Sequence, residues 1–419
     1  MIIKARNEGY RKMSLNEVAS GERIHISFFG MRNAGKSSVV NALTGLDLSV
    51  VSEVKGTTTD PVKRAMELLP LGPVVIIDTP GLDDEGELGQ KRVEKAMQIL
   101  AKTDIAVLVV DSTLGLSELD KELLKELEGR KIPYLVAYNK IDKGIATPSA
   151  RNDDGNKGIA TPSARNDGLV ISAKTGQGIN ELKEKLGSFA KLIKNEKHLV
   201  FDLVSPKDTI ILVIPIDESA PKGRLIMPQQ MAIRDLLDAH CSVICCQVQE
   251  LENTLNLLKN PPKLVITDSQ AFKEVSAIVP ENIDLTSFSI LMARYKGELD
   301  SLVKGAETLT LLKDGDKVLI SEGCVHHRQC NDIGTKKMPA WIEKYLKAKP
   351  EYAFSSGGDF PKDLSEFKLI VHCGGCMLNE TEMKNRISKA KDAGVPIVNY
   401  GMAIAKMNGI LTRSLKVLS

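Results

Sequence analysis

The sequence has few aromatic residues and almost no net charge. Phe, Trp and Tyr make up 4% of the 419 residues, and 56 basic side chains are balanced by 54 acidic ones, which leaves a net charge of +2. Surfaces that bind nucleic acid combine stacking aromatic rings with an excess of Lys and Arg. We therefore expect no nucleic-acid partner.

Long hydrophobic runs are also missing. The longest apolar segments, such as 105–110 and 209–216, have the length of strands, whereas a membrane span needs roughly 20 apolar residues. Residues 1–22 form a mixed, polar tail without the apolar core of a signal peptide. We expect a soluble, cytoplasmic protein with no membrane partner.

Cysteine is absent from the first 240 residues, and all seven cysteines lie in the C-terminal half. Such clustering argues against a disulfide framework and for a local thiol function in a reducing compartment. A chain of this length, with 42% hydrophobic residues, predicts two or three packed domains.

A phosphate-binding loop begins the first domain. An apolar strand, 24–29, is followed by G-x-x-x-x-G-K-S at 30–37 and by a helical stretch, 38–46. Backbone amides of such a loop surround phosphate groups, and the helix N-terminus adds a favourable dipole. We expect Lys36 to neutralise the β- and γ-phosphates and Ser37 to bind Mg²⁺. The alternative is a chance glycine-rich loop, which would not require the flanking strand and helix.

Three further motifs each follow a predicted strand. In D-T-P-G at 78–81, Asp78 is expected to hold Mg²⁺ through water and the Gly81 amide to meet the γ-phosphate. In N-K-I-D at 139–142, Asp142 can accept two hydrogen bonds from guanine that adenine cannot offer. S-A-K at 172–174 would support the guanine O6. Motifs at the carboxyl ends of strands predict a doubly wound α/β domain, and together they resemble a small GTPase.

Two segments refine the subtype. The sequence G-T-T-T-D at 56–60 resembles switch I of the TrmE–Era class, which places the Mg²⁺-binding threonine at Thr58, with Thr57 and Thr59 as neighbouring alternatives. Members of that class with asparagine at the position of Asn33 often use K⁺ as an added positive charge, so the resemblance implies K⁺ as an activator here.

Leu82 stands where Ras-type enzymes carry a water-orienting glutamine, which predicts slow intrinsic hydrolysis. Asp83, Asp84 or Glu85 could assist, or could form only a solvated acidic turn. The predicted catalytic residues are Lys36, Thr58, Asp78 and Gly81, with Ser37 and Thr58 as Mg²⁺ ligands. The predicted nucleotide-binding residues are Gly30, Asn33, Ala34, Gly35, Lys36, Ser37, Ser38, Asn139, Lys140, Asp142, Ser172, Ala173 and Lys174.

A tandem repeat interrupts this domain. The eleven residues KGIATPSARND occur at 143–153 and again at 157–167, within an insert that we place at 143–168. Gly, Pro, Ser, Asn and Asp favour a flexible surface loop, and such loops tolerate insertions. A tolerated duplication is the preferred interpretation; a functional basic patch is the alternative.

A second α/β unit follows. Predicted strands at 209–216, 242–248 and 263–267 alternate with helical segments at 231–239 and 251–258, which is typical of a parallel sheet. It has no phosphate-binding motif, so we expect an interaction or dimerisation domain. Cys241, Cys245 and Cys246 are interpreted as core-packing residues.

Two cysteine motifs follow strands of the last domain. Cys324-Val325-His326 comes after the predicted strand 317–320, and H-C-G-G-C at 372–376 comes after 368–371. A third strand is predicted at 395–399. Loops at the carboxyl ends of parallel strands converge, so Cys324, Cys373 and Cys376 are expected to share one metal site. Zinc and an iron–sulfur cluster both accept such ligands. The fourth ligand stays open among His326, His327, His372, Glu322 and a small exchangeable molecule, with Cys330 as a spare thiol.

The whole pattern resembles the maturation GTPases of [FeFe] hydrogenases, the HydF family. The resemblance implies a [4Fe–4S] cluster on the three cysteines, with His326 as the candidate fourth ligand, and a homodimer. It divides the chain into a GTPase domain (23–197), a dimerisation domain (198–290) and a cluster domain (291–419), all of the α/β class. It also implies the family's activity: a GTP-hydrolysing, Mg²⁺-dependent scaffold carries a two-iron precursor. Two radical S-adenosylmethionine maturases build that precursor, and apo-[FeFe]-hydrogenase receives it.

Two other functions fit parts of the sequence. One is a tRNA-modification or ribosome-assembly GTPase with a zinc-stabilised module, which the near-neutral charge disfavours. The other is a GTP-gated iron–sulfur redox sensor, which would need a closed cluster, for example with Cys330 as the fourth thiolate.

Overall fold

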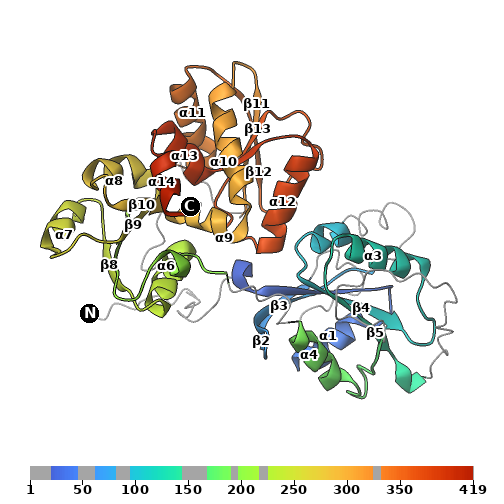
Figure 1. Ribbon diagram of the computed structural model, residues 1–419. Coiled ribbons are helices and arrows are strands. Elements are labelled where there is room, and N and C mark those ends of the chain that lie inside the picture. The colour runs from blue at the N-terminus through green and yellow to red at the C-terminus, as the bar shows by residue number, and fades with distance from the viewer. Residues whose placement is uncertain are drawn as a thin grey trace, which may run out of the picture.

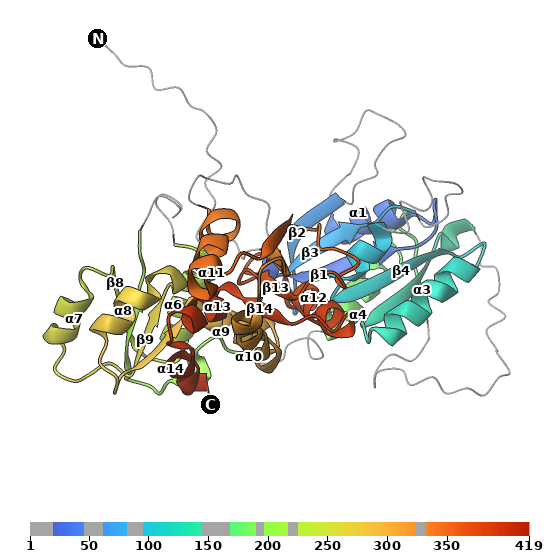
Figure 2. The same cartoon turned by 90° about the horizontal axis from the view of Figure 1, so that it is seen from above.

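The computed structural model describes residues 20–45, 62–81, 95–143, 168–189, 197–216, 225–323 and 332–418. Three sheets follow one another along the chain, and the C-terminal unit lies between the other two (Figures 1 and 2). Within these ranges, no helix is long and apolar enough to cross a membrane. Several sequence predictions lie outside them: those for 57–59, 82–85, 144–167 and 324–330.

The first sheet confirms the doubly wound GTPase prediction. Its order is β2-β3-β1-β4-β5-β6, and every pair is parallel except β2 with β3. Its elements are β1 (Ile24–Phe29), α1 (Lys36–Thr44), β2 (Val62–Leu68), β3 (Gly72–Asp78), β4 (Ile105–Asp111), α3 (Glu118–Gly129), β5 (Tyr134–Asn139), β6 (Leu169–Val170) and α4 (Ile179–Ser188). Helices cover both faces of the sheet, so the β4 run from Ile105 to Val110 is buried throughout.

The second sheet is fully parallel, as predicted, in the order β10-β9-β7-β8. Its elements are α6 (Met227–Asp238), α7 (Leu251–Leu257), α8 (Phe272–Ile278), α9 (Phe288–Lys296), β7 (Thr209–Val213), β8 (Ser242–Cys246), β9 (Leu264–Thr267) and β10 (Asp284–Ser287). Strand β10 was not among the predicted strands, because its sequence, D-L-T-S, has little hydrophobic signal.

The third sheet repeats the same arrangement, in the order β12-β11-β13-β14, again all parallel. Its elements are α10 (Leu299–Thr308), β11 (Lys317–Glu322), α11 (Met338–Leu346), β12 (Glu351–Ser356), β13 (Leu369–His372), α12 (Glu380–Asp392), β14 (Ile397–Asn399), α13 (Tyr400–Met407) and α14 (Leu411–Leu415). The two cysteine motifs therefore follow adjacent strands, β11 and β13, as expected.

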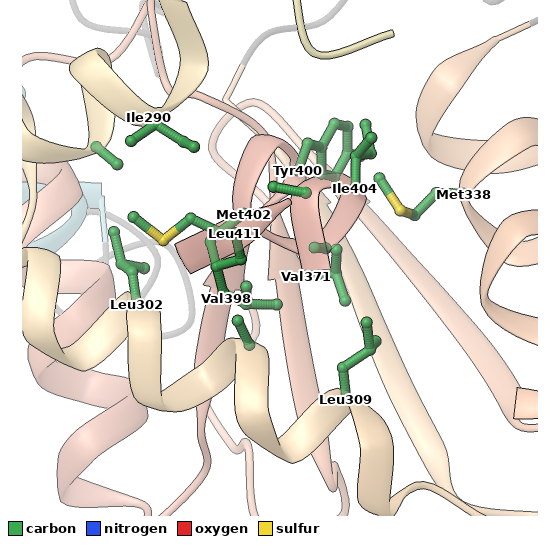
Figure 3. Packing of buried hydrophobic residues seen from close by; sticks show 14 of the residues in the cluster. Ile290, Leu302, Leu309, Met338, Val371, Val398, Tyr400, Met402, Ile404 and Leu411 are labelled. Atoms are coloured by element: carbon green, nitrogen blue, oxygen red, sulfur yellow. The ribbon is translucent and has the colours of Figure 1, made fainter. Parts of the chain in front are cut away.

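The second and third units share one hydrophobic core. Its cluster joins Ile211 and Val265 of the second sheet to Val371 and Val398 of the third, with α9, α10 and α13 between them. Figure 3 shows part of this cluster, where Ile290 of α9, Leu302 of α10 and Met402 of α13 lie near Val371 and Val398 of the third sheet. Because the core is continuous, these two units form a single packed body.

The core-packing interpretation of the middle cysteines is partly wrong. Cys241 is buried and Cys246 packs against the shared core, but Cys245 is exposed. Strand β8 is the edge strand of its sheet, and none of its five residues is fully buried.

Candidate functional site

The phosphate-binding loop has the backbone that its glycines predict. Gly30 has φ of 141°, and a Cβ atom there would lie 2.1 Å from the Val109 carbonyl oxygen. Asn33 (φ 62°) and Gly35 (φ 92°) are also left-handed, which curves the loop between β1 and α1. The Lys36 ammonium donates to the carbonyl oxygen of Gly30 at 3.0 Å. The lysine is thus held over the loop, where a phosphate group could take over its hydrogen bonds.

The two predicted Mg²⁺-binding side chains of this region lie together. Ser37 Oγ donates to Asp78 Oδ2 at 2.5 Å. The other oxygen, Asp78 Oδ1, is buried and has no hydrogen-bond partner among the described residues. Burial raises the pKa of Asp78, against the opposing hydrogen bond from Ser37 and the charge of Lys36. A buried carboxylate oxygen beside a hydroxyl fits Mg²⁺ and its water shell.

The base-recognition motifs enclose a cavity of about 640 Å³ beside α1. Asn139 connects two loops: its Nδ2 donates to the Ala34 carbonyl at 3.0 Å, and its Oδ1 accepts from the Ala173 amide at 3.0 Å. Ser172 Oγ donates to Asp142 Oδ1 at 2.8 Å, which orients the carboxylate. Lining residues include Gly35, Ser38, Lys140, Asp142, Ala173 and Lys174.

The cysteine loop, residues 373–376, lies at the carboxyl end of β13. Cys373 Sγ accepts hydrogen bonds from the amides of Gly323, at 3.1 Å, and of Gly375, at 3.4 Å. Burial raises the pKa of Cys373 to about 11, and those two amides oppose the rise. Burial also raises the pKa of Cys376, against the nearby Lys296 ammonium. In the metal-free protein the Cys373 thiol is therefore protonated at neutral pH.

These two cysteines fit part of a metal site. N–H···S hydrogen bonds stabilise thiolate ligands and tune iron–sulfur clusters. Gly323, whose amide reaches the Cys373 sulfur, immediately precedes Cys324 in the sequence. Within the described ranges, no group of three His, Cys, Asp or Glu side chains is placed to hold a metal ion, and the predictions for Cys324 and His326 fall outside them.

His372 is committed to hydrogen bonds that leave neither ring nitrogen for a metal. Its Nε2 lies 3.0 Å from the Arg386 guanidinium, which can only donate, and its Nδ1 lies 2.7 Å from the Cys373 carbonyl. The proton therefore resides on Nδ1. Burial lowers the pKa of His372 to about 3, and the Arg386 charge adds to this effect. His372 is a structural residue under the cysteine loop.

Two residues at the cysteine loop were not found by sequence reasoning. Asn379 caps α12 by accepting from the Glu382 amide at 3.0 Å, three residues after Cys376. An Asn followed by acidic residues is a recognisable helix-start signal. Lys296, at the end of α9, contacts the same loop. A lysine at the end of a helix is usually exposed to solvent, so the sequence does not predict that Lys296 contacts this loop.

Three family models match the chain. The 50S ribosome-binding GTPase model matches 25–140, the hydrogen maturase F dimerization domain matches 199–297, and the hydrogen maturase F tetramerization domain matches 300–417. The last two together cover more than half of the 419 residues. They meet between 297 and 300, after α9, whereas our expected boundary at 290 lies inside that helix.

Curated GTPases are similar to less than half of this chain. The tRNA modification GTPase MnmE of Dechloromonas aromatica is 33% identical over 42% of this chain and 38% of its own length. MnmE of Legionella pneumophila is 36% identical over 43% of this chain and 38% of its own length. GTPase Der of Kosmotoga olearia is 31% identical over 46% of this chain and 44% of its own length. The chain thus spans about two fifths of the length of these relatives.

Solved structures are likewise similar to less than half of this chain. A probable GTP-binding protein engB is 24% identical with a TM-score of 0.31, covering 40% of this chain and 99% of that one. The G domain of the T. maritima FeoB iron transporter is also 24% identical, with a TM-score of 0.28, covering 40% and 99%. The family models join a GTPase domain, which implies GTP, GDP and Mg²⁺ as ligands, to two maturase domains. The chain belongs to the hydrogen maturase F family.

Proposed function

We propose that this protein is a GTP-hydrolysing scaffold that carries a two-iron precursor to apo-[FeFe]-hydrogenase. The observation that supports it most is the cysteine loop of β13, with amides directed at a sulfur, in a chain that also holds a guanine-type cavity and both maturase domains. We do not propose the tRNA-modification activity named for the MnmE relatives, because the similarity covers only 42–43% of this chain and 38% of those proteins.

In the nucleotide site, Lys36 stabilises the β- and γ-phosphates, and Ser37, Thr58 and Asp78 hold Mg²⁺. The Gly81 amide meets the γ-phosphate, and Asp142 selects guanine. K⁺ beside Asn33 adds positive charge near the transferred phosphate. GTP hydrolysis then times partner binding, since switch segments that contact the γ-phosphate are released when that phosphate is lost.

In the cysteine site, Cys324, Cys373 and Cys376 hold a [4Fe–4S] cluster. When bound, the cluster supplies one iron with an exchangeable ligand, to which the two-iron cargo can attach and from which it can leave. His326 is the proposed residue at that position. The Gly323 and Gly375 amides stabilise the Cys373 thiolate. His372, which is buried and held by Arg386, donates to the Cys373 carbonyl and so fixes the start of the loop.

The open strand β8 is the surface that we propose for the homodimer. The Ser242 amide donates to the Asp208 carbonyl on the β7 side. Because strand amides alternate in direction, the N–H groups of Val243 and Cys245 point to the open edge. A second copy of β8 could pair with them and continue the sheet.

A delivery assay tests the proposal. The protein is produced together with two radical S-adenosylmethionine maturases, purified, and mixed with apo-[FeFe]-hydrogenase, and hydrogen evolution is measured. The wild type should activate the hydrogenase, and Cys373→Ala should not. Activation that is equally strong with Cys373→Ala, or no activation but specific tRNA retention in a filter-binding assay, would contradict the proposal.

A further inference from the structure

Lys296 carries a buried ammonium group at the centre of three chain segments. Its Nζ donates to the Leu378 carbonyl at 2.8 Å, to the Cys376 carbonyl at 3.1 Å and to the Gly21 carbonyl at 3.4 Å. It also lies 2.7 Å from Glu22 Oε1, and its side chain is 2% exposed. One amino group thus joins α9, the segment that enters β1, and the cysteine loop.

Such a group is costly to bury. An ammonium without water needs several hydrogen bonds and an opposite charge, and a well-packed apolar side chain of similar size usually stabilises a fold at least as well. Stability alone therefore does not explain a lysine at this position. Its acceptors indicate what the charge does: two of the three carbonyls belong to the turn that begins with Cys376.

We propose that Lys296 is a positioning residue for the metal site at the cysteine loop. By binding the carbonyls of Cys376 and Leu378, the ammonium fixes the turn that carries the Cys376 sulfur. It also places a positive charge beside a ligand that must be anionic when a metal is bound. This inference rests on the metal site under the proposed function, and adds to it a residue from the dimerisation domain.

The same ammonium explains how the loop is tied to the rest of the chain. Tyr295 Oη donates to Glu22 Oε2 at 3.2 Å, so two consecutive residues of α9 hold the segment just before β1. Gly21 fits closely against the loop: a Cβ atom there would lie 2.7 Å from the Cys376 carbonyl oxygen. The turn that begins with Cys376 therefore contacts both the Lys296 ammonium and the backbone of Gly21.

The test compares three variants of the full-length protein. Lys296→Met removes the charge but keeps the length of the side chain, and Lys296→Arg keeps the charge. Arg294→Met is the matched control, because Arg294 lies on the same helix and pairs with Asp202 instead of the cysteine loop. Co²⁺ alone is the first probe, followed through its thiolate charge-transfer absorption. The midpoint potential of the iron-reconstituted protein is the second. Thermal unfolding and GDP binding report whether each variant folds.

Lys296→Met should bind Co²⁺ about 10- to 100-fold more weakly than wild type, as is usual when a supporting group of a metal ligand is lost. Its midpoint potential should move to more negative values, because a nearby cation is gone. Lys296→Arg should keep the wild-type potential, and Arg294→Met should match wild type in both measurements.

Wild-type Co²⁺ affinity and potential in a folded Lys296→Met variant would overturn the role of Lys296. Equal loss of affinity in Lys296→Met and Lys296→Arg, with the potential unchanged in both, would also overturn it, since only packing would then matter. A wild-type protein that binds neither Co²⁺ nor iron would instead overturn the metal site itself.

Discussion

Asn379 Nδ2 lies 3.1 Å from Asp104 Oδ2, although the two residues are 275 positions apart in the sequence. Asp104 immediately precedes β4 of the GTPase sheet, and Asn379 caps α12, the helix that follows the cysteine loop. The same carboxylate accepts from the His25 amide at 2.8 Å and from the Thr381 hydroxyl. The start of α12 is therefore docked against the GTPase sheet, at the opposite end of β1 from the phosphate-binding loop.

This junction predicts a pH effect on stability. Burial raises the pKa of Asp104 despite its hydrogen bonds, so the folded protein binds a proton more tightly there than the unfolded chain, whose usual value is 3.8. The resulting stabilisation is complete below 3.8 and is lost as pH rises through the raised pKa. Asp104→Asn cannot titrate and should flatten this part of the stability profile. Urea unfolding from pH 3.5 upwards measures it.

Thr381→Val serves as the companion variant for that profile. It removes a hydrogen bond that opposes the effect of burial, while Asp104 still titrates. The pH window should therefore extend to higher pH than in wild type. A profile for Asp104→Asn that matches wild type at every pH would contradict the assignment of the effect to this carboxyl group.

Lys36 should be essential for GTP hydrolysis. Lys36→Ala removes the cation held over the phosphate-binding loop, and we expect the rate to fall by at least about 100-fold, as when other charge-stabilising groups are lost. Lys121→Ala is the control, because Lys121 forms an exposed ion pair with Glu118 on α3. This variant should hydrolyse GTP at the wild-type rate. The proposed timing role fails if partner dissociation from Lys36→Ala, with and without GTP, is unchanged from wild type.

Asp142 should determine base preference. Asp142→Asn replaces an acceptor that guanine needs by an amide that can donate to the 2-oxygen of xanthine. GTP affinity should fall by at least about 100-fold, because buried polar groups of the base lose their partners. Affinity for xanthosine triphosphate should rise in the same variant. Fluorescent-nucleotide competition measures both, and unchanged GTP affinity would rule out the assigned role.

The edge of β8 offers a sharp test of the dimer surface. Cys245→Pro removes an N–H that points to the open edge, so the β7 ladder is preserved while pairing with a second copy is blocked. Cys245→Ser keeps that N–H and is the control. Sedimentation analysis should find a smaller assembly for the proline variant and the wild-type assembly for the serine variant. Equal assemblies for both would exclude this edge as the interface.

Much of the GTPase site could be predicted because its motifs are contiguous and each follows a buried strand. The sequence also predicts that the cysteine motifs follow neighbouring strands. The contacts of Asp104 with Asn379, and of Lys296 with Cys376, could not be predicted, since they join residues that only the packed sheets bring together. Strands β10 and β12 were missed for a different reason: they are short or polar, and tertiary pairing rather than local preference forms them.

The most direct test of the account is an anaerobic purification with iron and sulfide assays and EPR spectroscopy of the dithionite-reduced protein. Wild type should hold about four irons per chain, as expected for one [4Fe–4S] cluster, and give a cluster signal that Cys376→Ala abolishes. A colourless protein with one zinc ion per chain, unchanged by iron reconstitution, would contradict the account.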